Sequence, residues 1–360
     1  MAEDKPEVFS VALVVIARDE ELRIERLLDS LGQNVESKVL VDTGSGDATV
    51  QRASVLGARV AQYAWSDDFS AARNAALDLA AADWHLVLDA DEWLIEGGEF
   101  LRQLRHIPPE FVGQVQLLDG NRSESDGTSA TARSWLSRLL PGHVRYQGRI
   151  HEQPVHQLPV HRTPLVIGHD GYRPEALAAK RGRNRRLLQA ELRDHPEDAY
   201  LLYQLGKDAD VYNEHALAAQ SFAAAWPRVA GSAPWRLDMV VRWMGSLKRL
   251  RRHEEALHLI HATQAEFDSS PDFHFAIGDL MLDWTATAPQ QANDLLGQAE
   301  QAWRRCLRLG ERPEQPGSVP GRGSHLAAFN LALVLEGTGR GAEAAELRRQ
   351  FGLSTGRLLG

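Results

Sequence analysis

The order of the apolar runs in the first half of the chain is the strongest constraint on its fold. Short runs rich in Val, Leu and Ile alternate with stretches that have the apolar periodicity of helices. The runs are apolar throughout, which is typical of strands that are buried on both faces of a parallel sheet. Strand, helix, strand, helix in this order predicts a doubly wound, Rossmann-like α/β domain with a mostly parallel sheet.

The first ninety or so residues divide into predicted elements at their apolar runs and turn residues. We expect four strands, at residues 8–17, 38–42, 59–63 and 84–88. Helices are expected between them, at residues 20–32, 48–56 and 70–82. The predicted buried face of the first helix carries Leu22, Leu27, Leu28 and Leu31.

The second half has a different period. From about Arg183 onward the strand signals fade, and paired helices with small residues at regular positions replace them. Gly206 and Phe222 in one pair correspond to Gly278 and Trp303 in another, and the pattern recurs about four times along the chain. It resembles the tetratricopeptide repeat, in which small residues let two helices approach closely. We therefore predict an α/β domain at 1–190 and an all-α helical repeat domain at 191–360.

Composition excludes several classes of protein. The chain has 40 Lys and Arg against 49 Asp and Glu, and this formal charge of −9 argues against nucleic acid as a partner. A single cysteine, Cys306, excludes an internal disulfide framework and fits a reducing compartment. The N-terminus lacks the features of a signal peptide, and no apolar run approaches the roughly 20 residues of a membrane span. A cytoplasmic protein without a transmembrane segment is predicted.

Two carboxylates follow the fourth predicted strand. Asp89 and Asp91 flank Ala90, so an extended backbone would direct both side chains to the same side. Hard cations such as Mg²⁺ and Mn²⁺ commonly bind one or two carboxylates together with substrate phosphates. The pattern suits a cation that holds a diphosphate leaving group. The alternative interpretation is a solvated turn after a strand.

Four segments in order carry a family resemblance. They are VIARDEE at 15–21, VDTGSGDAT at 41–49, WSDDFSAARN at 65–74 and WHLVLDADE at 84–92. Together they resemble the family-two glycosyltransferases of the GT-A fold. They look most like the branch with a tetratricopeptide-like tail that includes the sublancin-type S-glycosyltransferases. The resemblance implies a nucleotide-sugar donor, with uridine as the expected base, and a bound Mn²⁺ or Mg²⁺.

The resemblance also assigns donor contacts to the ends of the first two strands. Ala17, Arg18 and Asp19 would meet the uracil ring and the ribose, and the alternative role is to cap the following helix. Asp42 would receive the base or the ribose hydroxyls, and the alternative is to cap the turn at 43–46. The family usually has Asn where this chain has Asp19, and often Lys in place of Arg18.

Arg73 and Asn74 lie within an alanine-rich helix, where two polar groups have little structural motive. A cation facing Asp89 would bridge the diphosphate or pair with the carboxylates, and the alternative is a surface salt bridge. The expected donor-binding residues are Ala17, Arg18, Asp19, Asp42, Arg73, Asn74, Asp89 and Ala90.

Histidines are concentrated after the predicted sheet. Five of the 14 fall between His143 and His169. Two of these, His151 and His169, lie in the segments GRIHEQ at 148–153 and VIGHDGY at 166–172, which resemble two later motifs of the same branch. In this resemblance Glu152 is the base that deprotonates the acceptor, although an ion pair with a nearby Arg is the alternative. His169 would complete the metal shell beside Asp91. His151 would do so instead or hold the diphosphate, and a structural role is open for both histidines.

The expected function is therefore metal-dependent, inverting transfer of a sugar from a nucleotide-diphosphate sugar. A concave repeat surface suits an extended peptide or a second protein, which makes a peptide or protein side chain the expected acceptor. The same repeats would otherwise serve as a dimerisation module in a homodimer. Two further alternatives stay open at this point: a saccharide or lipid-linked acceptor in envelope polysaccharide synthesis, and a non-catalytic adaptor built on a degraded transferase.

Overall fold

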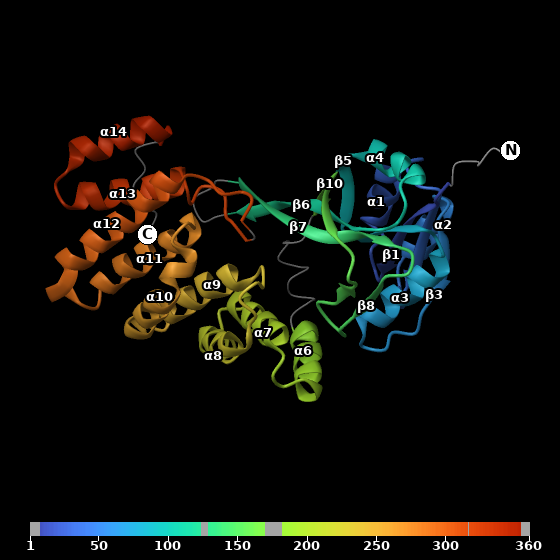
Figure 1. Ribbon diagram of the computed structural model, residues 1–360, viewed down its shortest axis with the longest axis horizontal. Coiled ribbons are helices and arrows are strands. Elements are labelled where there is room, and N and C mark those ends of the chain that lie inside the picture. Colours follow the sequence, from blue (N-terminus) through green and yellow to red (C-terminus); the bar gives the residue numbers. More distant parts are fainter. Residues whose placement is uncertain (1–7, 124–128, 170–181, 316, 354–360) are drawn as a thin grey trace. The chain divides into compact units, whose positions relative to one another are not determined.

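The computed structural model describes residues 8–123, 129–169, 182–315 and 317–353 (Figure 1). The chain divides into two compact units, Met1–Glu191 and Leu192–Gly360, and each is described by itself.

The first unit is built on an eight-stranded sheet with the order β3-β2-β1-β4-β7-β6-β10-β5. Four strands run parallel to one another at one side of this sheet, as the sequence predicts: β1 (Val11–Ala17), β2 (Ser37–Asp42), β3 (Arg59–Gln62) and β4 (Trp84–Asp89). Their carboxyl ends meet at one edge, because Ala17 is in register with Asp42 and Ile16 with Asp89. A ligand site at this edge is typical of doubly wound sheets.

The other half of the sheet was not predicted. It consists of β5 (Glu92–Glu96), β6 (Val112–Ser123), β7 (Ser129–Pro141) and β10 (Val160–His169). β7 pairs antiparallel with β4 and β6, while β10 pairs parallel with β6 and antiparallel with β5. A separate two-stranded sheet contains β8 (Arg145–Gln147) and β9 (Gln153–Val155).

Helices cover both faces of the parallel strands. Val11, Leu13 and Val15 of β1 pack in one core with α1 (Ile24–Leu31), α2 (Thr49–Val55) and α4 (Gly98–Gln103). Val14 packs on the opposite face with α3 (Phe69–Ala80). Burial on both faces confirms the interpretation of the continuous apolar runs.

The predicted start of the first helix is wrong. α1 begins at Ile24, and Leu22 is 86% exposed. The buried face is Ile24, Leu27, Leu28 and Leu31, and Leu22 lies about 200° around the helix axis from Ile24. The preceding residues form a separate turn, in which the Glu20 N–H donates to the Thr49 hydroxyl.

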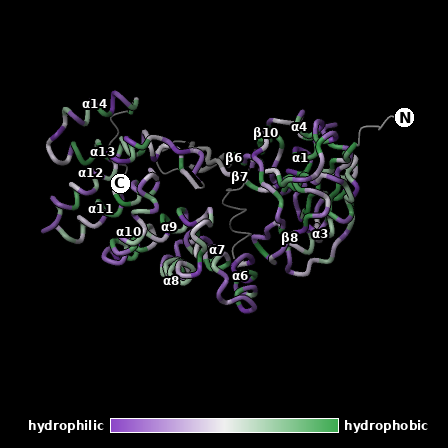
Figure 2. The backbone as a smooth tube through the Cα atoms, in the orientation of Figure 1, coloured by the Kyte–Doolittle hydropathy of each residue, from purple (hydrophilic) through white to green (hydrophobic). Residues whose placement is uncertain are grey.

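The second unit is helical, and α6 (Arg183–Asp194) contains the boundary between the two units. Its helices pack as four consecutive pairs: α7 (Ala199–Val211) with α8 (His215–Ala225), α9 (Arg236–Arg249) with α10 (His253–Phe267), α11 (Pro271–Thr285) with α12 (Ala292–Leu309), and α13 (His325–Gly337) with α14 (Gly341–Phe351). Figure 2 shows hydrophobic and hydrophilic residues alternating along these helices, as expected where one face of each is buried.

Small residues at the helix crossings support the repeat interpretation. A Cβ atom at Gly206 would collide with the Phe222 ring, and one at Gly278 would lie 2.6 Å from the Trp303 ring. Both aromatic rings are fully buried. The predicted tetratricopeptide-like architecture is confirmed. Within the described residues, no helix is long and apolar enough to cross a membrane.

Candidate functional site

The candidate site begins at the turn between β4 and β5. Asp89 is the last residue of β4, and its N–H donates to Glu92 Oε2 over 2.8 Å. Ala90 is buried in the hydrophobic core with 5% exposure, so its side chain anchors the turn. Asp89 and Asp91 are therefore presented at the carboxyl edge of the sheet by a turn that is held from both sides.

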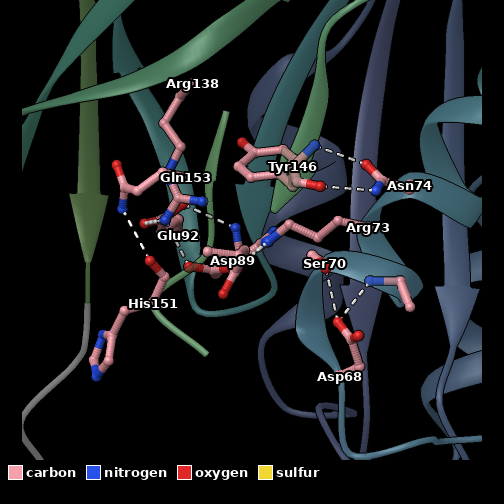
Figure 3. A network of polar contacts seen from close by, with 12 residues as sticks. Asp68, Ser70, Arg73, Asn74, Asp89, Glu92, Arg138, Tyr146, His151 and Gln153 are labelled. Atoms are coloured by element: carbon pink, nitrogen blue, oxygen red, sulfur yellow. Dashed lines mark hydrogen bonds and ion pairs between the residues drawn. The ribbon is translucent and has the colours of Figure 1, made fainter. Parts of the chain in front are cut away.

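Two arginines bind the two oxygens of Asp89. Arg73 Nη2 of α3 lies 2.5 Å from Asp89 Oδ1, and Arg138 Nη2 of β7 lies 2.7 Å from Oδ2 and 3.1 Å from Glu92 Oε1. Figure 3 shows these side chains converging from separate elements. The sequence pointed to Arg73 as a partner of the carboxylates, but it did not single out Arg138.

The two carboxyl groups in this network have opposite pKa shifts. Burial acts to raise the pKa of Asp89, but Arg138 and Arg73 together hold it well below its usual range. Burial raises the pKa of Glu92 to about 7, against the weaker lowering effect of Arg138. Glu92 benefits less from Arg138 because that guanidinium lies closer to Asp89, whose negative charge also repels Glu92.

Asp91 lies close to a histidine of β10, a strand near the edge of the sheet opposite to β3. The pairing of β5 with β10 sets His169 opposite Glu92, and His169 Nε2 lies 3.4 Å from Asp91 Oδ2. The remainder of the motif that contains His169, residues 170–172, lies outside the described residues. The structure thus brings together the two residues that the family resemblance assigned to the metal.

This pair fits a cation that shares its coordination with a substrate. A carboxylate oxygen and an imidazole nitrogen leave most positions of a six-coordinate ion to water and phosphate oxygens, as is usual for Mg²⁺. In the part of the chain that the structure describes, no group of three or more His, Cys, Asp and Glu side chains could hold a metal. The described residues therefore do not supply a complete set of metal ligands by themselves.

His151 and Glu152 occupy the turn between β8 and β9. Glu152 is 10% exposed and forms an ion pair with Arg73 Nε, so one guanidinium contacts both Glu152 and Asp89. This is the arginine pairing that the sequence left open as an alternative role. The ring of His151 points away from Asp89 and Glu92 (Figure 3). The backbone carbonyl of His151 accepts a hydrogen bond from Gln153 Nε2.

The residues after β1 and β2 are bound to each other at the same edge. Asp42 is 1% exposed and accepts hydrogen bonds from the Ser45 hydroxyl at 2.5 Å and from the N–H groups of Gly44 and Ser45. The Gly46 N–H donates to Asp19 Oδ1 over 2.7 Å, and the carbonyl of Ala17 accepts from Thr43. The side chain of Arg18 is 56% exposed. These contacts shape the loop at 43–46 beside the Asp89 turn.

The first unit matches a known family over most of its sheet. Residues 12–146 match the family model described as Glycosyl transferase family 2. The chain carries a family-2 glycosyltransferase domain. The matched segment contains Asp42, Arg73, Asp89, Asp91 and Arg138, whereas Glu152 and His169 follow it.

Relatives support the same conclusion. A TPR repeat-containing protein of Synechococcus elongatus is 38% identical over 214 residues, which cover 54% of this chain and 51% of that protein. The SPbeta prophage-derived glycosyltransferase SunS of Bacillus subtilis is 26% identical over 215 residues, covering 57% of this chain and 50% of SunS. An uncharacterized glycosyltransferase of Rickettsia typhi is 33% identical over 84 residues, which cover 23% of this chain and 28% of that protein. The chain spans about half the length of the first two relatives. With the family model, they support the predicted family-2 glycosyltransferase domain with a tetratricopeptide-like tail.

Asn74 of the family-2 domain has a different environment from the one expected of a donor contact. Its Nδ2 donates to the carbonyl of Tyr146 over 3.0 Å, and its Oδ1 accepts from the Tyr146 N–H over 2.9 Å. Both ends of the amide are therefore bound to the backbone of β8.

Proposed function

We propose that this protein transfers a sugar from a nucleotide-diphosphate sugar to an acceptor, with a divalent cation at Asp91 and His169. The approach of these two side chains at the carboxyl edge of a family-2 domain is the observation that carries the proposal. The neighbouring turn carries ion pairs between Asp89 or Glu92 and two arginines, Arg73 and Arg138. When bound, Mn²⁺ or Mg²⁺ would neutralise the charge that develops on the departing diphosphate.

The arginines have a different task from the proposed metal ligands. Arg73 and Arg138 occupy the two oxygens of Asp89, so this carboxylate anchors the turn that presents Asp91. Removing Asp89 would leave two buried guanidinium groups facing each other. Asp89 is therefore proposed to orient the site, while Asp91 and His169 hold the cation.

Glu152 is the proposed base. The nucleophilic atom of the acceptor attacks the sugar C1, the C1–O bond to the diphosphate breaks, and its electron pair leaves with the diphosphate. The proton of the acceptor passes to Glu152. A single displacement of this kind inverts the configuration at C1. Arg73 contacts both Glu152 and Asp89, which supports a base held close to the Asp89 turn.

The donor nucleotide is proposed to lie along the ends of β1 and β2. The ends of these strands carry Ala17, Arg18, Asp19 and Asp42, and β1 pairs with β4, the strand that ends at Asp89. A uridine diphosphate sugar is the proposed donor because of the family resemblance. A peptide or protein side chain is the proposed acceptor, since stacked helical pairs offer an extended surface for a polypeptide.

A ligand panel tests the proposal directly. The unfolding midpoint of the purified chain is measured with UDP, GDP and ADP, each with and without Mn²⁺, followed by donor hydrolysis assays on the corresponding sugars. Stabilisation that requires nucleotide and Mn²⁺ together is expected, by about 2.7 kcal/mol at 100 times the dissociation constant. An unchanged midpoint with every nucleotide, and no hydrolysis with or without EDTA, would overturn the proposal and favour the adaptor alternative.

A further inference from the structure

The β8–β9 hairpin is the least self-supporting part of the site. Its strands form only the pairs Arg145 with Val155, Tyr146 with Pro154 and Gln147 with Gln153, and they do not join the eight-stranded sheet. An isolated two-stranded hairpin is marginally stable in water. The position of Glu152, which directly precedes β9, therefore depends on what holds the hairpin to the rest of the unit.

Helix α3 supplies that attachment through several hydrogen bonds, one of which runs from Arg145 Nη2 to Asp78 Oδ1 over 2.6 Å. The Asn74 side chain binds both the N–H and the carbonyl of Tyr146, in the manner of one rung of a β ladder (Figure 3). Near the start of the helix, the Phe69 N–H donates to the Arg149 carbonyl over 2.8 Å. The Asn74 bonds hold the hairpin before the bend that leads from β8 to Glu152, and the Phe69 bond holds the bend itself.

The backbone of this bend needs such support. Gly148 has a φ of 96°, and His151 has a φ of 52° although it carries a side chain. A residue other than glycine in the left-handed region is held there at some energetic cost by its surroundings, and such residues cluster at functional sites. The residue before Asn74 in α3 is Arg73, which contacts Glu152, and the Tyr146 ring lies 5.6 Å from the Arg73 guanidinium.

We infer that Asn74 is a positioning residue, which docks the β8–β9 hairpin onto α3 and so fixes Glu152 against Arg73, instead of contacting the donor itself. The inference rests on the proposed function for the role of Glu152. It replaces the donor contact expected from the sequence with a contact to this chain's own backbone. Both polar groups of the amide are already bound within the hairpin, so a donor contact would have to displace a docking bond.

Steady-state kinetics separates the two roles. Asn74→Ala removes both hydrogen bonds, and Asn74→Asp places a carboxylate oxygen against the Tyr146 carbonyl. Each change is expected to lower kcat by about 10- to 100-fold, because a base displaced by about 1 Å loses that much. KM for the donor and the midpoint shift with UDP and Mn²⁺ should stay at wild-type values. A raised donor KM, or a lost ligand shift with normal kcat, would assign Asn74 to the donor and overturn the inference.

A double variant gives a second kinetic test. If Asn74 acts through Glu152, the pair Asn74→Ala with Glu152→Gln should be no slower than Glu152→Gln alone. Rate losses that multiply would show that Asn74 acts elsewhere. Gln51→Ala, on the exposed side of α2, is the control and should have wild-type kinetics.

Hydrogen exchange tests the docking without any turnover. In Asn74→Ala, amides of residues 145–155 should exchange at least about tenfold faster than in wild type, while those of β1 and β4 stay protected. Unchanged exchange in the hairpin would overturn the inference whatever the kinetics show. A wild-type protein without activity on any nucleotide sugar would instead overturn the proposed function, and faster exchange in Asn74→Ala would still show that the side chain docks the hairpin.

Discussion

The two units differ in what they place in their interiors. In the first, Arg73, Asp89 and Arg138 come from a helix and two strands, and their side chains are 6%, 34% and 13% exposed. In the second, the helix crossings are formed by glycines against buried aromatic rings, Gly206 with Phe222 and Gly278 with Trp303. At these positions the first unit joins charges from distant segments, whereas the second packs neighbouring helices by shape, although it also holds a buried ion pair, Asp272 with Arg322.

This contrast indicates where function and stability separate. Taking several ions out of water is unfavourable unless each is paired, and apolar groups of similar volume often serve stability as well or better. Close helix contacts add packing energy without such a penalty. A charge network in the interior of the first unit therefore marks the place where stability is exchanged for chemistry.

The largest expected effect separates activity from folding in the first unit. Asp91→Asn removes a proposed metal ligand and keeps the shape of the side chain. We expect kcat/KM to fall by about 1,000-fold, or about 4 kcal/mol, since a bound cation contributes several kcal/mol to the transition state. Donor turnover with Mn²⁺ and the far-UV spectrum are measured together.

Asp29→Asn, on the exposed side of α1, is the matched control and should keep full activity. Wild-type turnover in Asp91→Asn, or dependence on Mn²⁺ that does not change, would contradict the metal assignment.

Arg138→Met tests the charge network itself. The change leaves Glu92 without its guanidinium partner and Asp89 with Arg73 alone. Breaking a buried pair from one side costs about 3 to 5 kcal/mol, and the lower figure is expected here because Glu92, with a pKa of about 7, can take up a proton. The loss of unfolding free energy is measured by urea denaturation, with hydrogen exchange in peptides of the first unit as the readout.

The comparison variant is Arg252→Met in the second unit. Arg252 and Glu255 form an exposed pair three residues apart, and such pairs contribute at most about 0.5 kcal/mol. Equal losses in the two variants would show that the two units do not differ in how they use charge.

A glycine substitution tests packing in the helical unit. Gly206→Ala adds a methyl group where the Phe222 ring already lies, so overpacking should destabilise the unit by about 2 kcal/mol. This would occur although alanine is the better helix former by about 1 kcal/mol. Gly245→Ala in α9, with nothing within 4 Å of the new Cβ, should instead stabilise the unit by about 0.5 to 1 kcal/mol. Denaturation midpoints of both variants give the signs, and a stabilised Gly206→Ala would contradict close packing at this crossing.

Sequence patterns predicted the elements whose signals are local. The four parallel strands and α3 lie close to their expected ranges, because apolar periodicity and turn residues define them. The helical repeats of the second half were predicted as an architecture, from their recurring small residues. Strands β5 to β10 were missed. β5 and β6 pair with β10, and β7 pairs with β4, from segments far apart in the chain, and strand formation depends on such context. β8 and β9 have only three residues each. The start of α1 was wrong because the prediction included Leu22 in the buried face, whereas Leu22 precedes the helix and is 86% exposed.

The site was predictable where a motif carried it. Asp91 and His169 were proposed from the family resemblance, and β10 brings them together. Arg138 belongs to no motif, but it precedes two buried leucines, Leu139 and Leu140. A lone arginine in an apolar run was the signal that was available. The contact of Asn74 with a backbone 72 residues away has no local signal at all.

The smallest expected effect is a pH dependence confined to the first unit. His85 of β4 is 1% exposed, and burial, aided by Arg145, lowers its pKa to about 4. The unfolded chain binds this proton near pH 6.5, so the stabilisation is complete above pH 6.5 and declines as the pH falls toward 4. Between pH 7 and pH 5.5 the contribution of His85 to stability should fall by about 1 kcal/mol. Exchange of β4 amides in wild type and in His85→Gln measures it: the variant should lose less stability over this interval, and equal losses would assign the pH dependence to other groups.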